Sequence, residues 1–334
     1  MEMDMPKVEV LVLTKGEIEG LITRKDVVEA TELVYKAEGE GNLVQPQKEP
    51  MWMDSRKLNF IIAMPAYMKT INTAGVKWAC LYWDQQPGIP ATWGDILILN
   101  NPQNGQPFAI MDATAITNMR TAGGHAVVAA KYLAKKNSKV LAIIGCGAEA
   151  RIGLPAFKDF FPLETVRVYD TRPEAMTAFK KEMAGKVPVT VVTTASPEEA
   201  VKGSDIILMV TSAQEPVVFE PWVPEGCFVA GLYSFCDLDP MLSKKADKWV
   251  IGSRLSDGHM IVEDRTLVKN FQLSWDDVYA DMGDVVTGKK RGRENERERI
   301  VYTHLGMGGH DVAVGKLAYD KAKAKGVGRM VRLI

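Results

Sequence analysis

The sequence predicts an α/β fold that combines a doubly wound parallel sheet with a discontinuous α+β domain. The first observation is an apolar, β-type run over 140–144 that ends directly in the turn Gly145-Cys-Gly-Ala-Glu-Ala150. The second is the alternation of β-type and helical segments after this turn, which is typical of βαβ units. The third is a series of strands over 58–112 with no helices between them, which is typical of an α+β domain.

The segments before residue 136 predict the α+β domain. A strand is expected over 8–13, and Thr14 with Glu17 forms a capping box for a helix over 15–21. A second helix is expected over 24–38, because its apolar residues recur on one face. Strands of an antiparallel or mixed sheet follow at 58–63, 74–82, 95–100 and 108–112, and a long helix is expected over 115–136.

The remaining segments predict the doubly wound sheet. Strands are expected near 139–144, 165–169, 189–193, 205–210, 227–231 and 248–251, with helices near 148–160, 173–184 and 197–202. A last helix over 311–325 has one apolar side, and we expect it to return to the N-terminal domain. The predicted domains are therefore residues 1–118 together with 311–334, and residues 119–310.

The glycine turn predicts a dinucleotide site of the Rossmann type. Gly145 permits the tight turn, Gly147 lets a pyrophosphate approach the backbone, and Ala150 lets the next helix pack closely. Ala148 and Glu149 belong to the first turn of that helix, which offers free N–H groups and a positive dipole end to the phosphates. A glycine turn in an α/β unit that binds no nucleotide is the alternative.

An acidic residue ends the next expected strand. Asp170 is placed to accept both hydroxyls of the adenosine ribose and would repel a 2′-phosphate, which favours NAD. Arg172, after Thr171, could offset that repulsion, so NADP stays possible. Thr211 and Ser212 follow a later strand at the carboxyl edge of the sheet, where cofactors bind. A polar end to that strand, with no cofactor contact, is the alternative.

Composition and charge argue against several classes of protein. The 334 residues are 46% hydrophobic and 25% charged with a net charge of -1, so we expect no nucleic-acid or anionic-membrane partner. The basic run 289–293 precedes acidic residues and is expected to be a solvated loop and helix start. There is no apolar leader and no apolar run of about 18 residues, so a cytoplasmic protein is expected.

Cysteine and histidine spacing indicates neither a disulfide framework nor a metal site. The four cysteines form no CxxC pair, and no HxxxH or HExxH sequence occurs. His310, which follows Gly308-Gly309, is expected to be an exposed loop histidine.

Short motifs are spread over nearly the whole chain. They are Leu13-Thr-Lys-Gly-Glu-Ile18, Met64-Pro-Ala-Tyr67, Gly75-Val-Lys77, Thr117-Asn-Met-Arg-Thr-Ala122, the Gly145 turn, Leu238-Asp-Pro240, Met282-Gly-Asp-Val-Val-Thr-Gly288, Gly292-Arg293 and Lys323-x-x-Gly-Val-Gly328. In this order they resemble the ornithine cyclodeaminase/mu-crystallin family. The resemblance implies an NAD(P)-dependent enzyme on amino acids or their imines, usually a homodimer. It assigns substrate binding and dimerisation to 1–118 with 311–334, dinucleotide binding to 119–310, and the substrate to the cleft between these domains.

The resemblance also assigns residues to the substrate. Lys77 matches the family's active-site lysine, and Arg120 matches the arginine that clamps the substrate carboxylate. Lys48 falls where many members carry a second carboxylate-binding arginine, and it keeps the charge but lacks the bidentate fork. From the residues alone, Lys77 could be a surface lysine on a half-buried strand, and Arg120 a surface arginine at a predicted helix start.

One segment departs from the family. Many members carry a longer GAD-x-PGK-x-E sequence, whose aspartate lies beside the reacting carbon, where this chain has Leu232-Tyr233. Asp237 could substitute for that aspartate, and Tyr233 is expected to be a packed aromatic. Ornithine cyclisation is therefore not expected.

The function expected is an NAD(H)-dependent oxidoreductase acting on the α-carbon of an amino or imino acid. Arg120, helped by Lys48 and Lys77, would hold the carboxylate, and a proton would pass through Lys77, a water or Asp237. The alternatives are an ornithine cyclodeaminase with catalytic NAD and a non-catalytic, nucleotide-dependent small-molecule binder of the mu-crystallin type.

Overall fold

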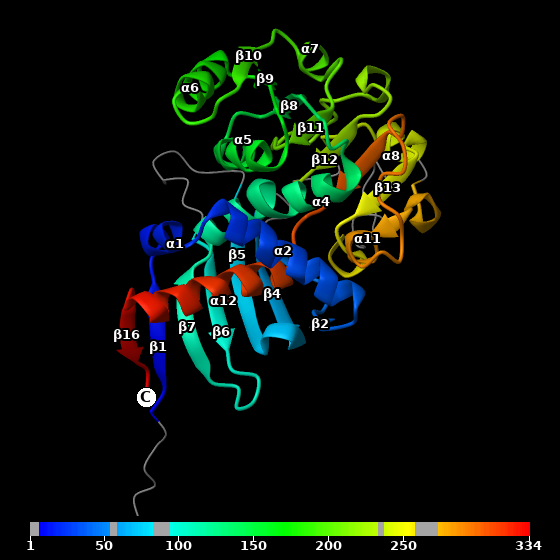
Figure 1. The fold of residues 1–334 in the computed structure, drawn as a ribbon. Coiled ribbons are helices and arrows are strands. Elements are labelled where there is room, and N and C mark those ends of the chain that lie inside the picture. The colour runs from blue at the N-terminus through cyan, green and yellow to red at the C-terminus, as the bar shows by residue number, and fades with distance from the viewer. Residues whose placement is uncertain (1–6, 54–58, 83–93, 233–236, 258–272) are drawn as a thin grey trace, which may run out of the picture. The chain divides into compact units, whose positions relative to one another are not determined.

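The computed structural model describes residues 7–53, 59–82, 94–232, 237–257 and 273–334 of the 334-residue chain. The chain forms two compact units, one of Met1–Arg120 with Met307–Ile334 and one of Thr121–Gly306 (Figure 1). Each unit has its own sheet and its own apolar core. Among the described residues, no helix is long and apolar enough to cross a membrane.

The first unit is built on a mixed sheet. Its elements are β1 Glu9–Leu13, α1 Lys15–Leu21, α2 Arg24–Gly39, β2 Leu43–Val44, β3 Pro50–Trp52, β4 Asn59–Met68, a 3₁₀ turn Lys69–Ile71, β5 Thr73–Tyr82, β6 Ile96–Asn100, β7 Pro107–Asp112, α3 Thr114–Arg120, α12 Gly308–Lys325 and β16 Arg329–Arg332. The strand order is β16-β1-β7-β6-β5-β4-β2, with β3 also paired to β4. Only β1 and β7 pair in parallel among the described strands of this sheet.

Helices cover one face of this sheet. Figure 1 shows α2 and α12 lying across its strands. Val312 and Val314 of α12 pack with Leu97 and Leu99 of β6 in one buried apolar cluster. Helix α1 starts with the expected capping interaction, since the carboxylate of Glu17 accepts hydrogen bonds from the backbone N–H and the hydroxyl of Thr14.

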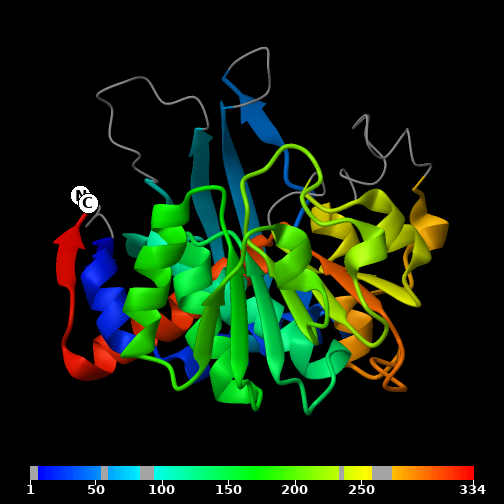
Figure 2. The same ribbon diagram turned by 90° about the horizontal axis from the view of Figure 1, so that it is seen from above.

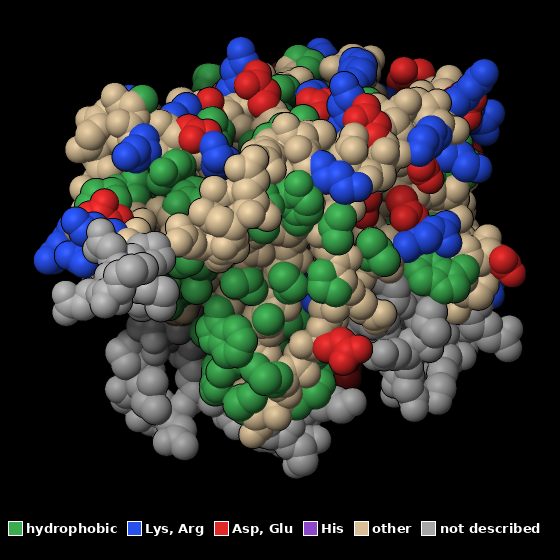
Figure 3. Space-filling model, turned by 90° about the horizontal axis from the view of Figure 1, so that it is seen from below, with side chains coloured by type: hydrophobic (Ala, Val, Ile, Leu, Met, Phe, Trp, Pro, Cys, Tyr) green, Lys and Arg blue, Asp and Glu red, His purple; other side chains and the backbone are tan. Residues whose placement is uncertain are grey.

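The opposite face of the same sheet is apolar and partly exposed. The strand register aligns Ala63 of β4, Trp78 of β5 and Ile96 of β6. Trp78 and Ile96 are 44% and 45% exposed. Figure 3 shows hydrophobic side chains gathered in the lower centre of that view, with most charged side chains above them. An exposed apolar surface of this kind is typical of an interaction site.

The second unit alternates strands and helices. Its elements are a π-helical turn η2 Thr121–His125, α4 Ala126–Leu133, β8 Val140–Ile144, α5 Ala148–Phe160, β9 Thr165–Tyr169, α6 Pro173–Ala184, β10 Thr190–Thr193, α7 Pro197–Val201, β11 Ile206–Met209, a 3₁₀ turn Glu220–Trp222, β12 Phe228–Gly231, α8 Pro240–Lys245, β13 Lys248–Ile251, a 3₁₀ turn Trp275–Asp277, β14 Ala280–Asp281, α11 Met282–Val286 and β15 Ile300–Thr303. Helices α5, α6 and α7 lie where the sequence predicts helices, whereas α8 and α11 were not predicted.

The sheet of the second unit is parallel and doubly wound, which confirms the predicted fold class. Its strand order is β10-β9-β8-β11-β12-β15-β13-β14, and every described pairing is parallel. Figure 2 shows these strands side by side between helices. The order reverses between β8 and β11, and ligands of such sheets bind at the carboxyl ends of the strands at this reversal.

The sequence does not predict strand β15, Ile300–Thr303. The strand is fully buried and pairs with both β12 and β13. Its four residues follow a long charged segment, so the local pattern is too short to identify a strand, and long-range pairing decides its place. Strands β14 and β16 are also not predicted, because they too are short.

The long helix expected over 115–136 is divided into α3, the π-helical turn and α4. The small residues of this turn let helix α5 approach closely. A Cβ on Gly123 would lie 2.9 Å from Cγ2 of Ile152, and one on Gly153 would lie 3.0 Å from Cβ of Ala122. The small residues of the π-helical turn therefore make room for a helix.

Candidate functional site

A buried cluster of charged side chains lies in the first unit. Lys77 comes from β5, Arg120 is the last residue of α3, and Asp311 lies in the first turn of α12. One carboxylate oxygen of Asp311 lies 3.1 Å from Nζ of Lys77, and the other accepts a hydrogen bond from Nε of Arg120 at 3.2 Å. The three side chains are 2%, 5% and 0% exposed. The structure thus brings together the two cations that the family resemblance assigned to the substrate.

The guanidinium of Arg120 is only partly used by this cluster. Its Nε is bonded to Asp311, whereas its two Nη groups have no hydrogen-bond partner among the described residues. The sequence placed Arg120 at a helix start, but it ends α3 and is almost completely buried. A buried guanidinium with two parallel N–H donors available matches the geometry of a carboxylate.

Asp311 is a site residue that the sequence analysis missed. An acid in the first turn of a helix is ordinary, because it complements the helix dipole. Nothing in the local pattern indicates that α12 returns to β5 and α3 with this carboxylate facing two cations. Only the tertiary contact identifies it.

Two further groups extend the cluster. Nζ of Lys77 donates a hydrogen bond to Oγ1 of Thr117 at 3.1 Å, and that hydroxyl donates to Oδ2 of Asp95 at 3.4 Å. The other oxygen of Asp95 accepts from the backbone N–H of Cys80 at 3.1 Å. Burial lowers the pKa of Lys77, with Asp311 opposing the shift and Arg120 adding to it. Burial likewise raises the pKa of Asp95.

Lys48 is buried in the segment between β2 and β3. The neighbouring Gln45 holds this segment against the start of α12, since its Nε2 lies 3.2 Å from Sδ of Met307 and its Oε1 accepts from Gly309 N–H at 3.4 Å. The segment that carries Lys48 is therefore tied to the helix that carries Asp311.

The glycine turn of the second unit has the geometry that a nucleotide site requires. Gly145 has a φ of +98°, and a Cβ there would lie 2.5 Å from the carbonyl oxygen of Val210. A Cβ on Gly147 would meet nothing within 4 Å, so the space in front of this residue is open. Gly147 is the N-cap of α5, and no side chain caps that helix. The first N–H groups of α5 are thus available for an anion.

Two residues of the predicted nucleotide set take part in the packing of this turn. Ala150 is fully buried, as close packing of α5 requires. The carboxylate of Glu149 accepts a hydrogen bond from the backbone N–H of Ala122 at 3.0 Å. Ala148, by contrast, is an exposed residue of the first helical turn. Glu149 therefore ties α5 to the π-helical turn.

Asp170 lies at the end of β9 and supports the turn. Its side chain is 9% exposed; Oδ2 accepts from the backbone N–H of Cys146 at 2.8 Å, and Oδ1 from that of Arg172 at 2.9 Å. Thr171 and Arg172 are exposed. Burial, followed by the Asp170 charge, raises the pKa of the Cys146 thiol to about 12.

Asp237 and Thr211 form a second buried polar pair in this unit. The hydroxyl of Thr211, just after β11, donates to Oδ2 of Asp237 at 2.9 Å. Oδ1 of Asp237 has no hydrogen-bond partner among the described residues. Burial raises the pKa of Asp237 to about 7, with the Thr211 hydrogen bond opposing the shift. Ser212 is exposed beside this pair, and Tyr233 lies outside the described residues.

Buried histidines are a further feature that the sequence did not predict. In the second unit, Nδ1 of His304 lies 2.9 Å from Oδ2 of Asp257, and its ring packs edge-to-face on that of His125. In the first unit, His310 lies inside α12 and packs edge-to-face on Tyr35. The expectation of an exposed loop for His310 is wrong, because α12 begins three residues earlier than predicted.

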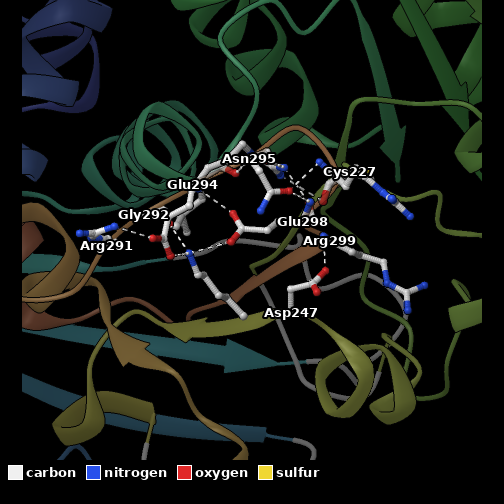
Figure 4. Close-up of polar contacts among 12 residues, drawn as sticks. Cys227, Asp247, Arg291, Gly292, Glu294, Asn295, Glu298 and Arg299 are labelled. Atoms are coloured by element: carbon white, nitrogen blue, oxygen red, sulfur yellow. Dashed lines mark hydrogen bonds and ion pairs between the residues drawn. The ribbon is translucent and has the colours of Figure 1, made fainter.

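The basic run 289–293 is a loop in which Lys289, Lys290 and Arg291 are exposed, as predicted, but no helix starts there. The guanidinium of Arg293 is half-buried and donates to the carbonyl oxygens of Leu133 and Glu298 at 2.7 and 2.6 Å. Figure 4 shows Glu294 and Glu298 converging beside this loop, and both lie within 2.9 Å of Nζ of Lys248. These charges are paired with one another and anchor the loop that precedes β15, so they do not form a ligand site.

Comparisons with known proteins identify the family of the chain. The model of the ornithine cyclodeaminase/mu-crystallin family matches residues 8–326. The chain belongs to this family. The resemblance inferred from the dispersed motifs is thereby confirmed.

Relatives in this family match the chain over almost its full length. The chain is 32% identical to alanine dehydrogenase of Archaeoglobus fulgidus over 331 residues, which are 97% of this chain and 98% of that protein. An archaeal alanine dehydrogenase dimer with bound NAD has a TM-score of 0.89 at 32% identity, covering 98% and 100% of the two chains. Thermococcus litoralis Δ1-pyrroline-2-carboxylate reductase, in complex with NADH and L-proline, has a TM-score of 0.87 at 32% identity, covering 96% and 99%.

Proposed function

We propose that the protein is an NAD(H)-dependent oxidoreductase that acts on the α-carbon of an amino or imino acid, as an imine reductase or amino-acid dehydrogenase. The observation that carries the proposal is the buried pair of cations, Lys77 and Arg120, held by the single carboxylate of Asp311. A dinucleotide turn of suitable geometry in the same chain supports it. The names of the relatives, an alanine dehydrogenase and an imino-acid reductase, support the same class of substrate.

Arg120 binds the substrate carboxylate in this proposal. Its two Nη groups are available, and Asp311 fixes the guanidinium through Nε. Such a bidentate contact both holds and orients the substrate carboxylate. Correct orientation lowers the activation barrier of a reaction whose centres must align. Lys48 adds a second positive charge for the same carboxylate.

Lys77 handles the proton at the substrate nitrogen. Its lowered pKa brings the ammonium closer to the range in which it can both give and accept a proton. Asp237, with a pKa raised to about 7 and one oxygen without a partner among the described residues, is the second proton-transfer group proposed.

The second unit would hold the dinucleotide. The residues proposed to contact it are Gly145, Gly147, Ala148, Glu149, Ala150, Asp170, Thr171, Arg172, Thr211 and Ser212. When bound, NAD(H) supplies or accepts the hydride at the α-carbon. The carboxylate of Asp170 favours NAD over NADP, because a 2′-phosphate would meet its negative charge.

We also propose that the protein forms a homodimer through the outer face of the first unit's sheet. Trp78 and Ile96 are almost half exposed on that face and pair with each other, and Trp78 also pairs with the apolar Ala63. Burying such a surface against a second copy removes apolar area from water at roughly 25 cal/mol per Å². The archaeal alanine dehydrogenase among the relatives is a dimer.

A screen of substrates with NADH tests the proposed function. The candidates are 2-oxo acids with ammonia or amines, and cyclic imines such as Δ1-pyrroline-2-carboxylate. Net loss of NADH absorbance with at least one of them is the expected result. Ammonia release from ornithine without net NADH change would instead identify a cyclodeaminase. Ligand binding with no turnover of any candidate would identify a non-catalytic binder.

A further inference from the structure

We propose that Asp95 is a further positioning residue of the substrate site, and that it acts on Lys77 through the hydroxyl of Thr117. The proposal rests on the proposed function and extends it to the proton that accompanies the hydride. The three side chains form a continuous hydrogen-bonded chain, with 3.1 Å between Lys77 Nζ and Thr117 Oγ1 and 3.4 Å between that oxygen and Asp95 Oδ2.

Asp95 differs from the other carboxylate of the cluster in its partners. Asp311 is held between Lys77 and Arg120 and forms an ion pair with each of them. Among the described residues, the hydrogen bonds to the carboxylate of Asp95 come from neutral groups, the hydroxyl of Thr117 and the backbone N–H of Cys80. Asp95 is therefore the carboxylate of the cluster that can take up a proton without losing an ion pair. Its buried position, 5% exposed, also favours the protonated form.

Lys77 is surrounded by groups from several elements. Asp311 of α12 and Asp95, just before β6, raise its pKa; Arg120 of α3 lowers it; and burial lowers it most. Thr117 of α3 is the neutral group in direct contact. The lowered pKa of Lys77 and the raised pKa of Asp95 reduce the difference in proton affinity between the two ends of the chain.

The hydride and the proton leave the substrate by separate routes. In the oxidative direction, a hydride leaves the α-carbon for bound NAD, and the N–H proton of the substrate amine passes to the neutral amine of Lys77. Lys77 passes a proton to Thr117 Oγ1, whose own proton moves to Asp95 Oδ2 and converts the carboxylate to the acid. The substrate loses one hydride and one proton and becomes an imine. Reduction is the reverse sequence.

If Asp95 served only as the acceptor for the Cys80 N–H, replacing it with Asn should leave catalysis unchanged. Asn in its place keeps an acceptor for the Cys80 N–H and a similar volume, but it cannot ionise. Asp95→Asn should therefore fold normally and bind NADH normally. Asp112→Asn is the matched control, because Asp112 on the neighbouring strand also accepts from a backbone N–H, that of Ala115, and is not part of the hydrogen-bonded chain that leads to Lys77.

The first test is the pH dependence of kcat and KM with the best substrate. For Asp95→Asn we expect kcat to fall by about 10-fold or more with KM changed less than about twofold. The limb of the profile that reports Lys77 should move to lower pH by about one unit, because a negative charge that stabilises the ammonium is removed. Thr117→Val should reduce kcat similarly. Most of the wild-type kcat should be retained in Thr117→Ser, in Asp95→Glu and in the Asp112→Asn control.

The second test needs no turnover. The pH titration of Lys77 is followed by NMR in protein labelled with ¹⁵N-lysine, and its signal is assigned by its loss in Lys77→Met. Asp95→Asn should move this titration to lower pH, and Asp112→Asn should not. If this shift occurs but no substrate is turned over, the proposed function fails and the coupling stands. Unchanged titration and an unchanged pH profile in Asp95→Asn would overturn the inference, even in an active enzyme.

Discussion

The two candidate sites of this molecule are built in opposite ways. The substrate site of the first unit consists of side chains from β5, α3 and α12, which lie far apart in the sequence. The proposed pyrophosphate part of the nucleotide site, in the second unit, consists of backbone from one continuous turn. The first depends on charge balance in a buried place, and the second depends on the absence of side chains. Substitutions should therefore harm them through different forces.

The largest effect is expected for Asp311→Asn. This change leaves the buried cations Lys77 and Arg120 without their shared carboxylate, and breaking a buried ion pair costs about 3–5 kcal/mol. The free energy of unfolding, measured with urea, should fall by that amount. Asp320→Asn is the control on the same helix, because Asp320 pairs with Lys316 at the surface and should contribute little. Equal stability of both variants would contradict the charge balance described here.

Arg120→Ala should separate the two sites functionally. Loss of a charged partner of a bound carboxylate costs about 2–5 kcal/mol, so kcat/KM should fall about 30-fold to several thousand-fold. NADH binding, measured by fluorescence, should change little, because the glycine turn is built without this residue. The kcat/KM of Arg120→Lys should lie between those of wild type and Arg120→Ala. A comparable loss of NADH affinity would place Arg120 in the nucleotide site instead.

A pair of glycine variants examines the nucleotide site in the same way. Gly145→Ala should reduce stability by about 1–3 kcal/mol, because its φ is +98° and the new Cβ would meet the carbonyl of Val210. Gly147→Ala should leave stability unchanged, since its Cβ meets no protein atom within 4 Å. NADH binding should nevertheless weaken in Gly147→Ala if the pyrophosphate fills that space. Unchanged NADH affinity in this variant would place the pyrophosphate elsewhere.

Cofactor choice should show the smallest effect. Wild type should bind NADH more tightly than NADPH, and Asp170→Ala should narrow the difference, because the charge that repels a 2′-phosphate is removed. Arg172→Ala is the companion variant and should widen it. A tenfold preference of wild type for NADPH, about 1.4 kcal/mol, would show that Arg172 dominates.

The contrast between the sites also explains what the sequence could predict. The turn at Gly145 is local, so its strand, glycines and following helix can be read from consecutive residues. Lys77 and Arg120 became candidates only through the family resemblance, because a lone lysine on a strand carries no signal of its own. Asp311, Asp95 and strand β15 escaped prediction, since each is defined by contacts with residues distant in sequence.

The cysteine inside the nucleotide turn has a consequence for the protein in oxidising surroundings. Burial and the neighbouring Asp170 raise the pKa of Cys146 to about 12, so the thiolate fraction at neutral pH is on the order of 10⁻⁵. The thiolate is the form that reacts with peroxides and alkylating reagents, so Cys146 should react slowly with them despite its place in the turn. The glycine turn should therefore keep its geometry, and its capacity to accept an anion, in surroundings that would oxidise a more acidic thiol at this position.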